Sequence, residues 1–437
     1  MARPSSPSRP STVSYARYGA LGLPLAFISI PLYVHVPAFY AAETGVGLAT
    51  IGLILLAVRI LDMVADPIIG SLSDRHPSGR KLIMALAVPL LAVSYFLLFT
   101  PPEVFGATAT SWWLALTLVA VYAGYSALTI NYYAMGVALA PSSHDHTRIA
   151  LWREAAMLVG VLLASLLPPL LSGALDSKEA YRATGLVLAL LLPLAAIATL
   201  TLPVERGRQP PVRARFIFPI GLLRMPRVRW ALLVTFFNAF PVAVTSTLFL
   251  FFVADVLVAP AHSGPLLAVY FASAVIGMPF WSRLSRIYGK SSSILVAMLA
   301  AVVFFAWAGL LGAGDVLQFY AVCFLAGLTL GADTVLMPSL FADQLDGARD
   351  QSGAAFGWWH FLNKAALALA AGIALPLLAF GGYAPERVNS PGALALLSAS
   401  YALLPCACKA FAAFILYLSP LHRLPTEGKR TEDTVPA

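Results

Sequence analysis

The sequence predicts an all-α polytopic membrane protein with twelve transmembrane helices in two six-helix halves. Three observations predict this fold class: the composition, the recurrence of long apolar segments and the placement of basic residues. Of the 437 residues, 59% are hydrophobic and 11% are charged, whereas soluble domains are roughly 45–50% apolar and about 25% charged. A soluble core of this size cannot bury so much apolar surface, so a lipid solvent is the simpler explanation.

Apolar segments of about 20 residues, the length that crosses ~30 Å of hydrocarbon, recur along the chain. We expect twelve spans, at 16–41, 48–72, 82–100, 111–139, 148–171, 182–203, 230–257, 264–282, 291–312, 316–341, 354–380 and 391–418. Several contain proline, for example Pro67 and Pro338. A helix bundle tolerates these prolines because neighbouring helices and hydroxyls satisfy the freed carbonyls.

The basic residues predict the orientation of the chain. Of the 28 Lys and Arg residues, only Lys178, Arg182 and Arg387 fall on the side opposite the N-terminus. Four lie well within spans, namely Arg59, Arg153, Lys364 and Lys409, and residues at the ends of spans are counted with the adjoining loops or tails. The remaining 21 lie in tails and loops on the N-terminal side, so the positive-inside rule predicts that both termini are cytoplasmic. The net charge of +8 therefore reflects topology, and we expect no nucleic-acid partner. Three scattered cysteines in apolar runs indicate neither a disulfide framework nor a metal centre.

The expected organisation has five parts. Residues 1–15 form a cytoplasmic tail without the apolar run of a signal peptide, 16–203 the first six-helix half, 204–229 a basic linker, 230–418 the second half and 419–437 a second cytoplasmic tail. The halves echo each other, because GSLSDRHPSGRK (70–81) follows the second span and GMPFWSRLSRIYGK (277–290) follows the eighth. Such weak repetition is typical of transporters built from parallel repeats.

The motif at 70–81 resembles the loop signature of the major facilitator superfamily. The preceding run RILDMVADPIIG (59–70) is similar to the second helix of the glycoside–pentoside–hexuronide:cation symporters, the melibiose-permease type. WREAAMLVG (152–160), GADTVLMPSLFADQLD (331–346) and FGWWHFLNK (356–364) extend the resemblance in the same order along the chain. The resemblance implies the major facilitator fold and cation-coupled symport of a small organic solute, a sugar or glycoside among the candidates, by alternating access.

Asp62 and Asp66 are four residues apart within a span, so they share one helix face. Two like charges at bilayer depth are costly unless a cation lies between them or one is protonated. The pair therefore predicts a Na⁺ or Li⁺ site or a shared proton, and the resemblance implies cation coordination here. We include Thr129 among the cation ligands and expect no other cofactor. The alternative is that Arg59, one turn earlier, neutralises the pair, which then only ties helices together.

The chain departs from the melibiose type at two positions. That type carries sugar-binding acids in its first and fourth helices, where this chain has the run Gly22-Leu23-Pro24-Leu25 and Thr129. Galactoside recognition therefore does not carry over.

The resemblance implies that Arg153 contacts the solute and that Lys364, with Arg59, balances charge in the cavity. Further expected solute contacts are polar or aromatic residues within spans: Tyr125, Asn131, Tyr132, Trp152, Trp358, Asn363 and Lys364. Tyr33 and His35 belong to the same class, and a proton-carrying role for His35 stays open.

The cluster Asp74, Arg75 and Arg80 predicts a gating device in the cytoplasmic turn. Asp74 is expected to accept hydrogen bonds from a helix N-terminus or from a neighbouring arginine, which would hold one conformation. In the second repeat, Arg283 and Arg286 have no acidic residue at the position that matches Asp74. Asp343 and Asp346, after the tenth span, are the expected substitutes and would act from across the halves.

Three further charges within spans have simpler expected roles. Glu154 is expected to pair locally with Arg153. Asp333 either lines the cavity or stabilises a helix kink. Lys409, near the middle of the last span, is expected to face lipid or to extend toward the interface.

Two rival functions remain open. The missing acids also fit a lipid-like solute that enters between helices, and a non-transporting sensor or assembly protein on the same scaffold is the rival from another class. No nucleotide motif, paired histidines or Ser–Lys dyad stands out, so we expect no enzyme. The expected setting is the bacterial inner membrane, with lipids and a small solute as partners of a monomer.

Overall fold

The computed structural model describes residues 11–30, 32, 36–75, 79–102, 104–140, 142–172, 177–203, 220–345, 349–383 and 389–421. Every regular element within these ranges is helical. The chain divides into two compact units, Met1–Leu222 with Leu345–Phe361 (unit 1) and Leu223–Gln344 with Leu362–Ala437 (unit 2). Unit 1 contains the residues of the first expected half and unit 2 most of those of the second, while the segment Leu345–Phe361 packs with unit 1.

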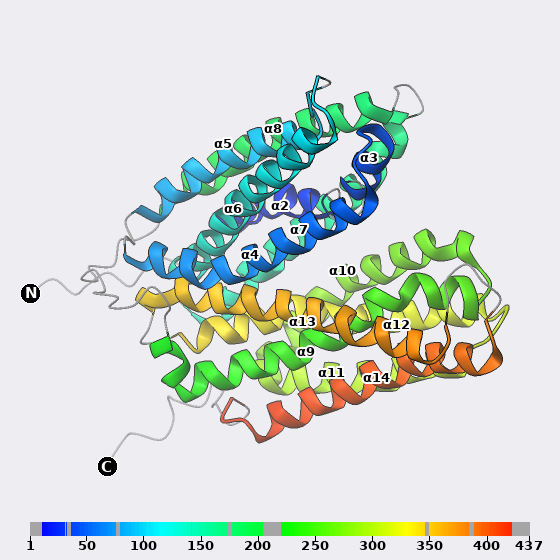
Figure 1. Ribbon diagram of the computed structural model, residues 1–437. Coiled ribbons are helices and arrows are strands. Elements are labelled where there is room, and N and C mark those ends of the chain that lie inside the picture. The colour runs from blue at the N-terminus through cyan, green and yellow to red at the C-terminus, as the bar shows by residue number, and fades with distance from the viewer. Residues whose placement is uncertain are drawn as a thin grey trace, which may run out of the picture. The chain divides into compact units, whose positions relative to one another are not determined.

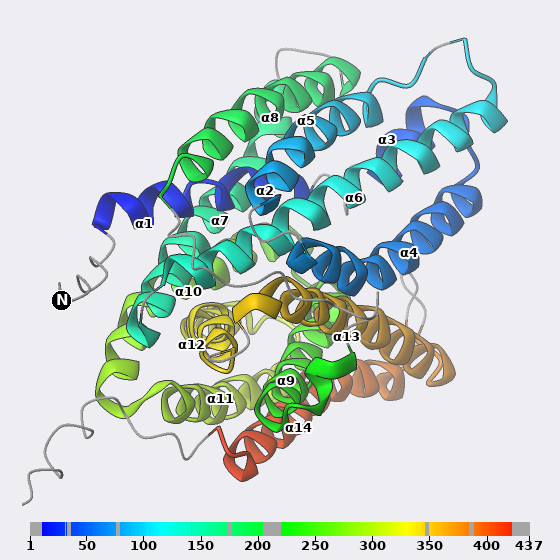
Figure 2. The same ribbon diagram turned by 90° about the vertical axis from the view of Figure 1, so that its left-hand side faces the viewer.

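Unit 1 contains eight helices and the start of a ninth (Figures 1 and 2). They are α1 (Thr12–Gly19), α2 (Gly22–Ile30), α3 (Val36–Glu43), α4 (Leu48–Arg75), α5 (Arg80–Leu98), α6 (Ala107–Leu139), α7 (Ser143–Ser172), α8 (Ser177–Leu200) and the first turns of α13 (Ser352–Phe380). Within the unit, α2 packs on α7, α5 packs on α6 and α8, and α4 packs on α6.

Unit 2 contains α9 (Pro226–Phe251), α10 (Ser263–Tyr288), α11 (Lys290–Ala306), α12 (Val316–Asp343), the rest of α13 and α14 (Pro391–Leu418). Here α10 packs along α12, α9 packs on α14, and α11 packs on both α12 and α14. Proline occupies the first position of α9 and α14, where its missing N–H costs no hydrogen bond. Gly289, with φ 83°, makes the sharp turn from α10 to α11.

Nine helices among the described residues are long and apolar enough to cross a membrane. The other three expected spans, 16–41, 48–72 and 148–171, coincide with α1–α3, α4 and α7. The structure is thus consistent with the predicted twelve-span helical membrane protein. One expected boundary differs, because Thr12–Tyr15 belongs to α1 and Tyr15 is buried with its hydroxyl donating to Asp145 at 2.6 Å. Through this contact, the end of the expected N-terminal tail packs against α7 in unit 1.

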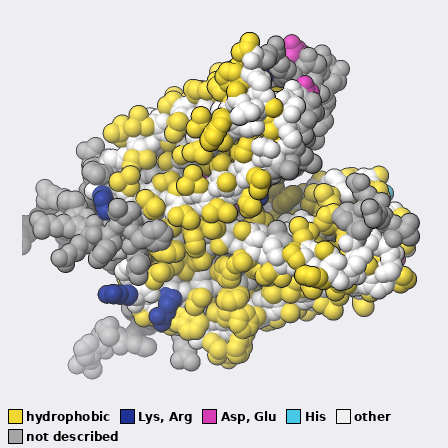
Figure 3. Space-filling view, viewed as in Figure 1, with side chains coloured by type: hydrophobic (Ala, Val, Ile, Leu, Met, Phe, Trp, Pro, Cys, Tyr) yellow, Lys and Arg dark blue, Asp and Glu magenta, His cyan; other side chains and the backbone are white. Residues whose placement is uncertain are grey.

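Large apolar side chains are exposed along the helices of both units. Leu82 and Leu190 in unit 1 are 63% and 69% exposed, and Ile276 and Val303 in unit 2 are 60% and 69% exposed. In Figure 3, hydrophobic side chains cover most of the coloured surface, and few charged ones interrupt them. Such apolar surface is unfavourable in water and favourable against lipid tails. The helix surfaces therefore match a bilayer as solvent.

Candidate functional site

Asp62 and Asp66 lie one turn apart on α4, and their exposed fractions are 6% and 0%. The Ser126 hydroxyl on α6 donates to Asp62 Oδ1 at 2.8 Å, across the α4–α6 contact. Thr129 follows Ser126 by three residues and so lies on the same face of α6. Its hydroxyl donates to the Tyr125 carbonyl at 2.7 Å, which leaves the oxygen able to accept or to bind a cation.

These groups give unit 1 a set of buried oxygen atoms on two adjacent helices, and cation binding by them stays a prediction. The sequence analysis named the carboxylates and Thr129 as candidates but did not name Ser126, whose hydroxyl contacts Asp62. The available signal was its spacing of three residues from Thr129, which places both hydroxyls on one helix face. Arg59 lies one turn before Asp62 and its side chain is exposed.

Arg153 on α7 is 3% exposed and forms an ion pair with Glu154, with Nη2 2.8 Å from Oε1. The expected local pair is therefore present. The Arg153 guanidinium also lies over the Tyr133 ring, 3.7 Å from its centroid, a cation–π contact. The Tyr133 ring also makes a T-shaped contact with the ring of His360 of α13, with centroids 5.0 Å apart. A cation–aromatic cluster of α6, α7 and α13 thus lies within unit 1.

Two of the expected solute contacts use their polar groups inside the protein. Tyr132 stacks on Tyr18 at 4.4 Å, and each hydroxyl donates to the other residue's backbone carbonyl, at 2.8 and 2.9 Å. Asn131 accepts a hydrogen bond from the Ser73 hydroxyl and donates to the Ala127 carbonyl at 2.7 Å. These contacts tie α6 to α1 and to α4.

The remaining expected solute residues are distributed over both units. Tyr125 and Trp358 in unit 1 are half-buried, and Trp152 is 38% exposed. Asn363 and Lys364 lie on the part of α13 that belongs to unit 2. Charge balance between Lys364 and the carboxylates of unit 1 therefore stays a prediction. Tyr33, His35 and Asp346 lie outside the described residues.

Asp74, at the end of α4, is 2% exposed and holds the partners expected of it. Arg80 forms an ion pair with its Oδ1. The backbone N–H groups of Gly353 and Ala354 donate to Oδ1 and Oδ2 at 2.8 and 2.6 Å. These two groups belong to the first turn of α13, where unpaired N–H groups favour an anion. Asp74 thus fastens the start of α13 to unit 1. Arg75 is half-buried beside it.

In unit 2, Lys290 at the start of α11 pairs with Asp343 at the end of α12, at 2.7 Å. Asp343 was expected to serve Arg283 or Arg286; its ion pair with Lys290 lies within unit 2, and a contact with either arginine stays a prediction. Arg80 and Lys290 each follow a glycine at the start of a helix, so the sequence repeat extends to an ion pair in each unit.

The expectation for Lys409 was wrong. Its side chain is 6% exposed and pairs with Asp333 of α12. The packing of α14 in unit 2 turns this face inward, which hydropathy alone does not reveal. Asp333 also lines a cavity within unit 2, and its role in transport stays a prediction.

The family described as MFS/sugar transport protein matches residues 17–423. The chain belongs to this family. It is therefore a major facilitator transporter and a multi-pass integral membrane protein, and its relatives include symporters of the glycoside–pentoside–hexuronide type.

Two relatives and one solved structure illustrate the likeness. The chain is 22% identical to the inner membrane symporter YicJ of Escherichia coli, over 93% of this chain and 92% of that protein. It is 24% identical to the sodium-dependent lysophosphatidylcholine symporter 1 of Xenopus tropicalis, over 85% and 78%. The fold is similar to that of the E. coli fucose:proton symporter FucP, with a TM-score of 0.69 at 14% identity over 93% of this chain and 98% of that one.

Proposed function

We propose that the protein is a symporter that couples the movement of a cation to that of a small organic solute by alternating access. The carrying observation is the burial of Asp62 and Asp66 on one face of α4, with the Ser126 hydroxyl on Asp62. Buried carboxylates in a span favour a bound cation or proton. Carboxylate and hydroxyl oxygens are hard ligands, which suit Na⁺ or Li⁺.

The solute belongs to one of two classes. The family name and the fucose:proton symporter favour a sugar or glycoside. The lysophosphatidylcholine symporter favours a lipid-like solute, and the absence of acids at Pro24 and Thr129 is compatible with it. Arg153, Tyr125, Trp152 and Trp358 are the proposed solute contacts in unit 1. We propose a bacterial inner membrane as the location, since one relative is an inner membrane symporter. We also propose that the protein is a monomer and that both termini are cytoplasmic, as the distribution of basic residues favours.

The coupling proposal is tested by equilibrium binding of radioactive Na⁺ to the purified protein. We expect saturable binding in the wild type, at least a tenfold loss of affinity in Asp62→Asn and Asp66→Asn, and a smaller loss in Ser126→Ala. Glu43→Gln, which neutralises an exposed carboxylate at the end of α3, is the matched control and should bind normally.

If Na⁺ does not bind, the same variants are compared for proton-driven uptake in liposomes. Uptake of a neutral glycoside or of lysophosphatidylcholine then identifies the solute class. Wild-type Na⁺ affinity and wild-type uptake in both aspartate variants would refute cation coupling at this pair.

A further inference from the structure

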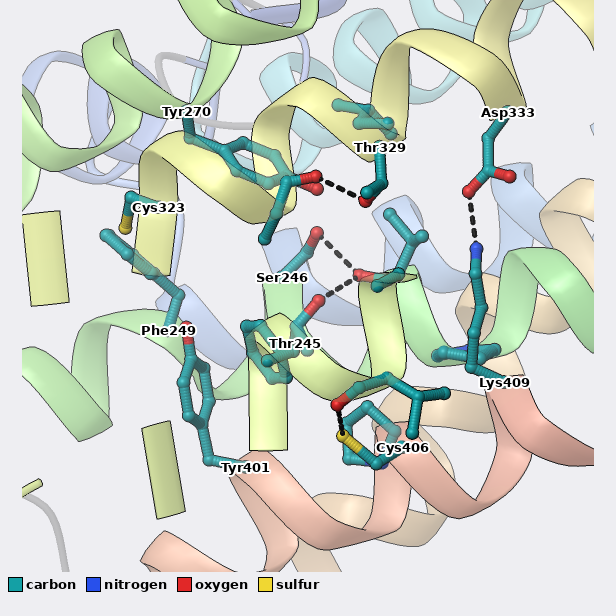
Figure 4. A pocket seen from close by; sticks show the side chains of 18 of the residues that line it. Thr245, Ser246, Phe249, Tyr270, Cys323, Thr329, Asp333, Tyr401, Cys406 and Lys409 are labelled. Carbon is teal, nitrogen blue, oxygen red and sulfur yellow. Dashed lines mark hydrogen bonds and ion pairs between the residues drawn. The ribbon is translucent and has the colours of Figure 1, made fainter. Parts of the chain in front are cut away.

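Unit 2 contains a cavity of about 100 Å³ lined by residues of α9, α10, α11, α12 and α14 (Figure 4). One water molecule needs roughly 10–15 Å³ on this measure. The cavity therefore admits a ring-sized group rather than a single water molecule. Every residue that lines it belongs to unit 2. Asp62 and Asp66 of α4 are therefore not part of this cavity.

A buried ion pair forms one side of the cavity. Lys409 of α14 donates to Asp333 Oδ2. The other oxygen, Asp333 Oδ1, is buried and accepts no hydrogen bond from any residue that the structure describes. A buried carboxylate oxygen without a donor is unfavourable. Lys409 carries three N–H donors, so the pair can serve a further group that both donates and accepts.

Three further hydroxyls that line the cavity donate within their own helices. Thr245 and Ser246 both donate to the Val242 carbonyl, at 2.9 and 2.8 Å, and Thr329 donates to the Ala326 carbonyl at 2.7 Å. Figure 4 shows these bonds as dashed lines. Because these hydroxyls donate within their own helices, the lone pairs of their oxygens are available to accept from a ligand. The polar part of the wall is therefore rich in acceptors.

The rest of the wall is largely apolar. Phe249 and Phe305 contribute rings, and Leu267, Leu330 and Pro405 contribute aliphatic surface. In Figure 4, Phe249 and Tyr401 lie on the side away from Asp333 and Lys409. The cavity is thus amphipathic, with a largely apolar wall and the charged pair at one side, which is the usual character of a small-molecule site.

These features together define a ligand. The Asp333–Lys409 pair has no net charge, so it favours a neutral molecule over an ion. A hydroxyl can donate to Asp333 Oδ1 and accept from Lys409 at once. A sugar ring would place most of its hydroxyls against apolar walls, at a cost for each unpaired group. We propose that this cavity binds a small neutral ring compound with a single hydroxyl, a phenol or an alicyclic alcohol, with the hydroxyl on the Asp333–Lys409 pair.

The test uses the full-length protein in lipid nanodiscs and fluorine NMR, with empty nanodiscs subtracted. The probe is meta-fluorophenol, and its methyl ether, meta-fluoroanisole, keeps the ring but lacks the donor. Hydrogen bonds to charged groups are worth about a tenfold or larger change in affinity. We therefore expect the phenol to bind at least tenfold more tightly than the ether. Equal affinities, or no specific binding of the phenol, would overturn the proposal without any variant.

Two variants locate the site. Asp333→Leu with Lys409→Met removes both charges together, and the phenol should lose its advantage over the ether. Asp343→Leu with Lys290→Met is the matched control, because it removes the other α12 ion pair of the same unit, whose residues do not line the cavity. This control should keep the preference for the phenol, and equal loss in both doubles would assign the effect to stability.

Ala326→Leu places a larger side chain in the cavity and leaves both residues of the ion pair unchanged. It should abolish binding of both probes. Binding that survives this change lies elsewhere and refutes the assignment. Neither transport nor the coupling cation enters these measurements, so their outcome is independent of the proposed symport at Asp62 and Asp66.

Discussion

Several buried charges in the described helices form ion pairs, and three of these pairs join two helices. Asp74 with Arg80 links α4 to α5, Asp343 with Lys290 links α12 to α11, and Asp333 with Lys409 links α12 to α14. Burying one charge costs several kcal/mol, and a partner offsets this cost only in good geometry. Loss of one partner should therefore harm the protein more than loss of both.

The Asp74–Arg80 pair offers a direct test at the residue scale. We expect Asp74→Asn and Arg80→Gln each to lower the free energy of unfolding, and the double variant to lose less than the sum. The expected coupling energy is about 1–3 kcal/mol, measured by reversible detergent denaturation of the purified protein. Strictly additive losses would show that the two side chains do not stabilise each other.

What the sequence predicts about single residues depends on whether local spacing determines the contact. Asp62 and Asp66 share a face because they are four residues apart, and Arg153 meets Glu154 because they are adjacent. Lys409 was misassigned because its partner lies on another helix, 76 residues away. Helix periodicity places a side chain on a face, but the neighbouring helix decides whether that face meets lipid or a carboxylate.

At the scale of elements, glycines allow α4 and the start of α13 to approach closely. A Cβ on Gly70 would lie 2.2 Å from the Gly353 carbonyl oxygen, and one on Gly357 would lie 2.6 Å from the Asp66 carbonyl oxygen. No larger residue fits such an approach without a shift of the backbone. Together with the Asp74 hydrogen bonds, these contacts explain why Leu345–Phe361 packs with unit 1 although the chain places it after most of unit 2.

Gly353→Ala should separate α4 from α13. The added Cβ would lie 2.7 Å from both Asp74 Oδ1 and the Gly70 carbonyl oxygen, so we expect a lower thermal unfolding midpoint and reduced uptake in liposomes. Gly372→Ala on the same helix is the matched control, since nothing lies within 4 Å of its added Cβ. It should be neutral or gain up to about 1 kcal/mol from helix propensity. Equal effects of the two substitutions would rule out the close approach as their cause.

At the scale of the whole molecule, hydropathy and repeated motifs predicted the helical membrane fold and the two halves. They did not predict that the first turns of α13 join unit 1, because that assignment rests on contacts between residues about 280 positions apart, such as Asp74 with Gly353 and Ala354. The cavity of unit 2 is equally invisible in the sequence, since five separate helices contribute to it.

The orientation in the membrane is the remaining prediction for the whole chain. Basic residues lie overwhelmingly on the side of the N-terminus, so the positive-inside rule places the start of α9 in the cytoplasm and the end of α3 outside. After replacement of Cys323, Cys406 and Cys408 by alanine, single cysteines are introduced at the exposed positions Glu43 and Arg227. A membrane-impermeant maleimide added to intact spheroplasts should label Glu43→Cys, and should label Arg227→Cys only after permeabilisation. The reverse pattern would invert the topology and with it the assignment of Asp74 and Arg80 to a cytoplasmic gate.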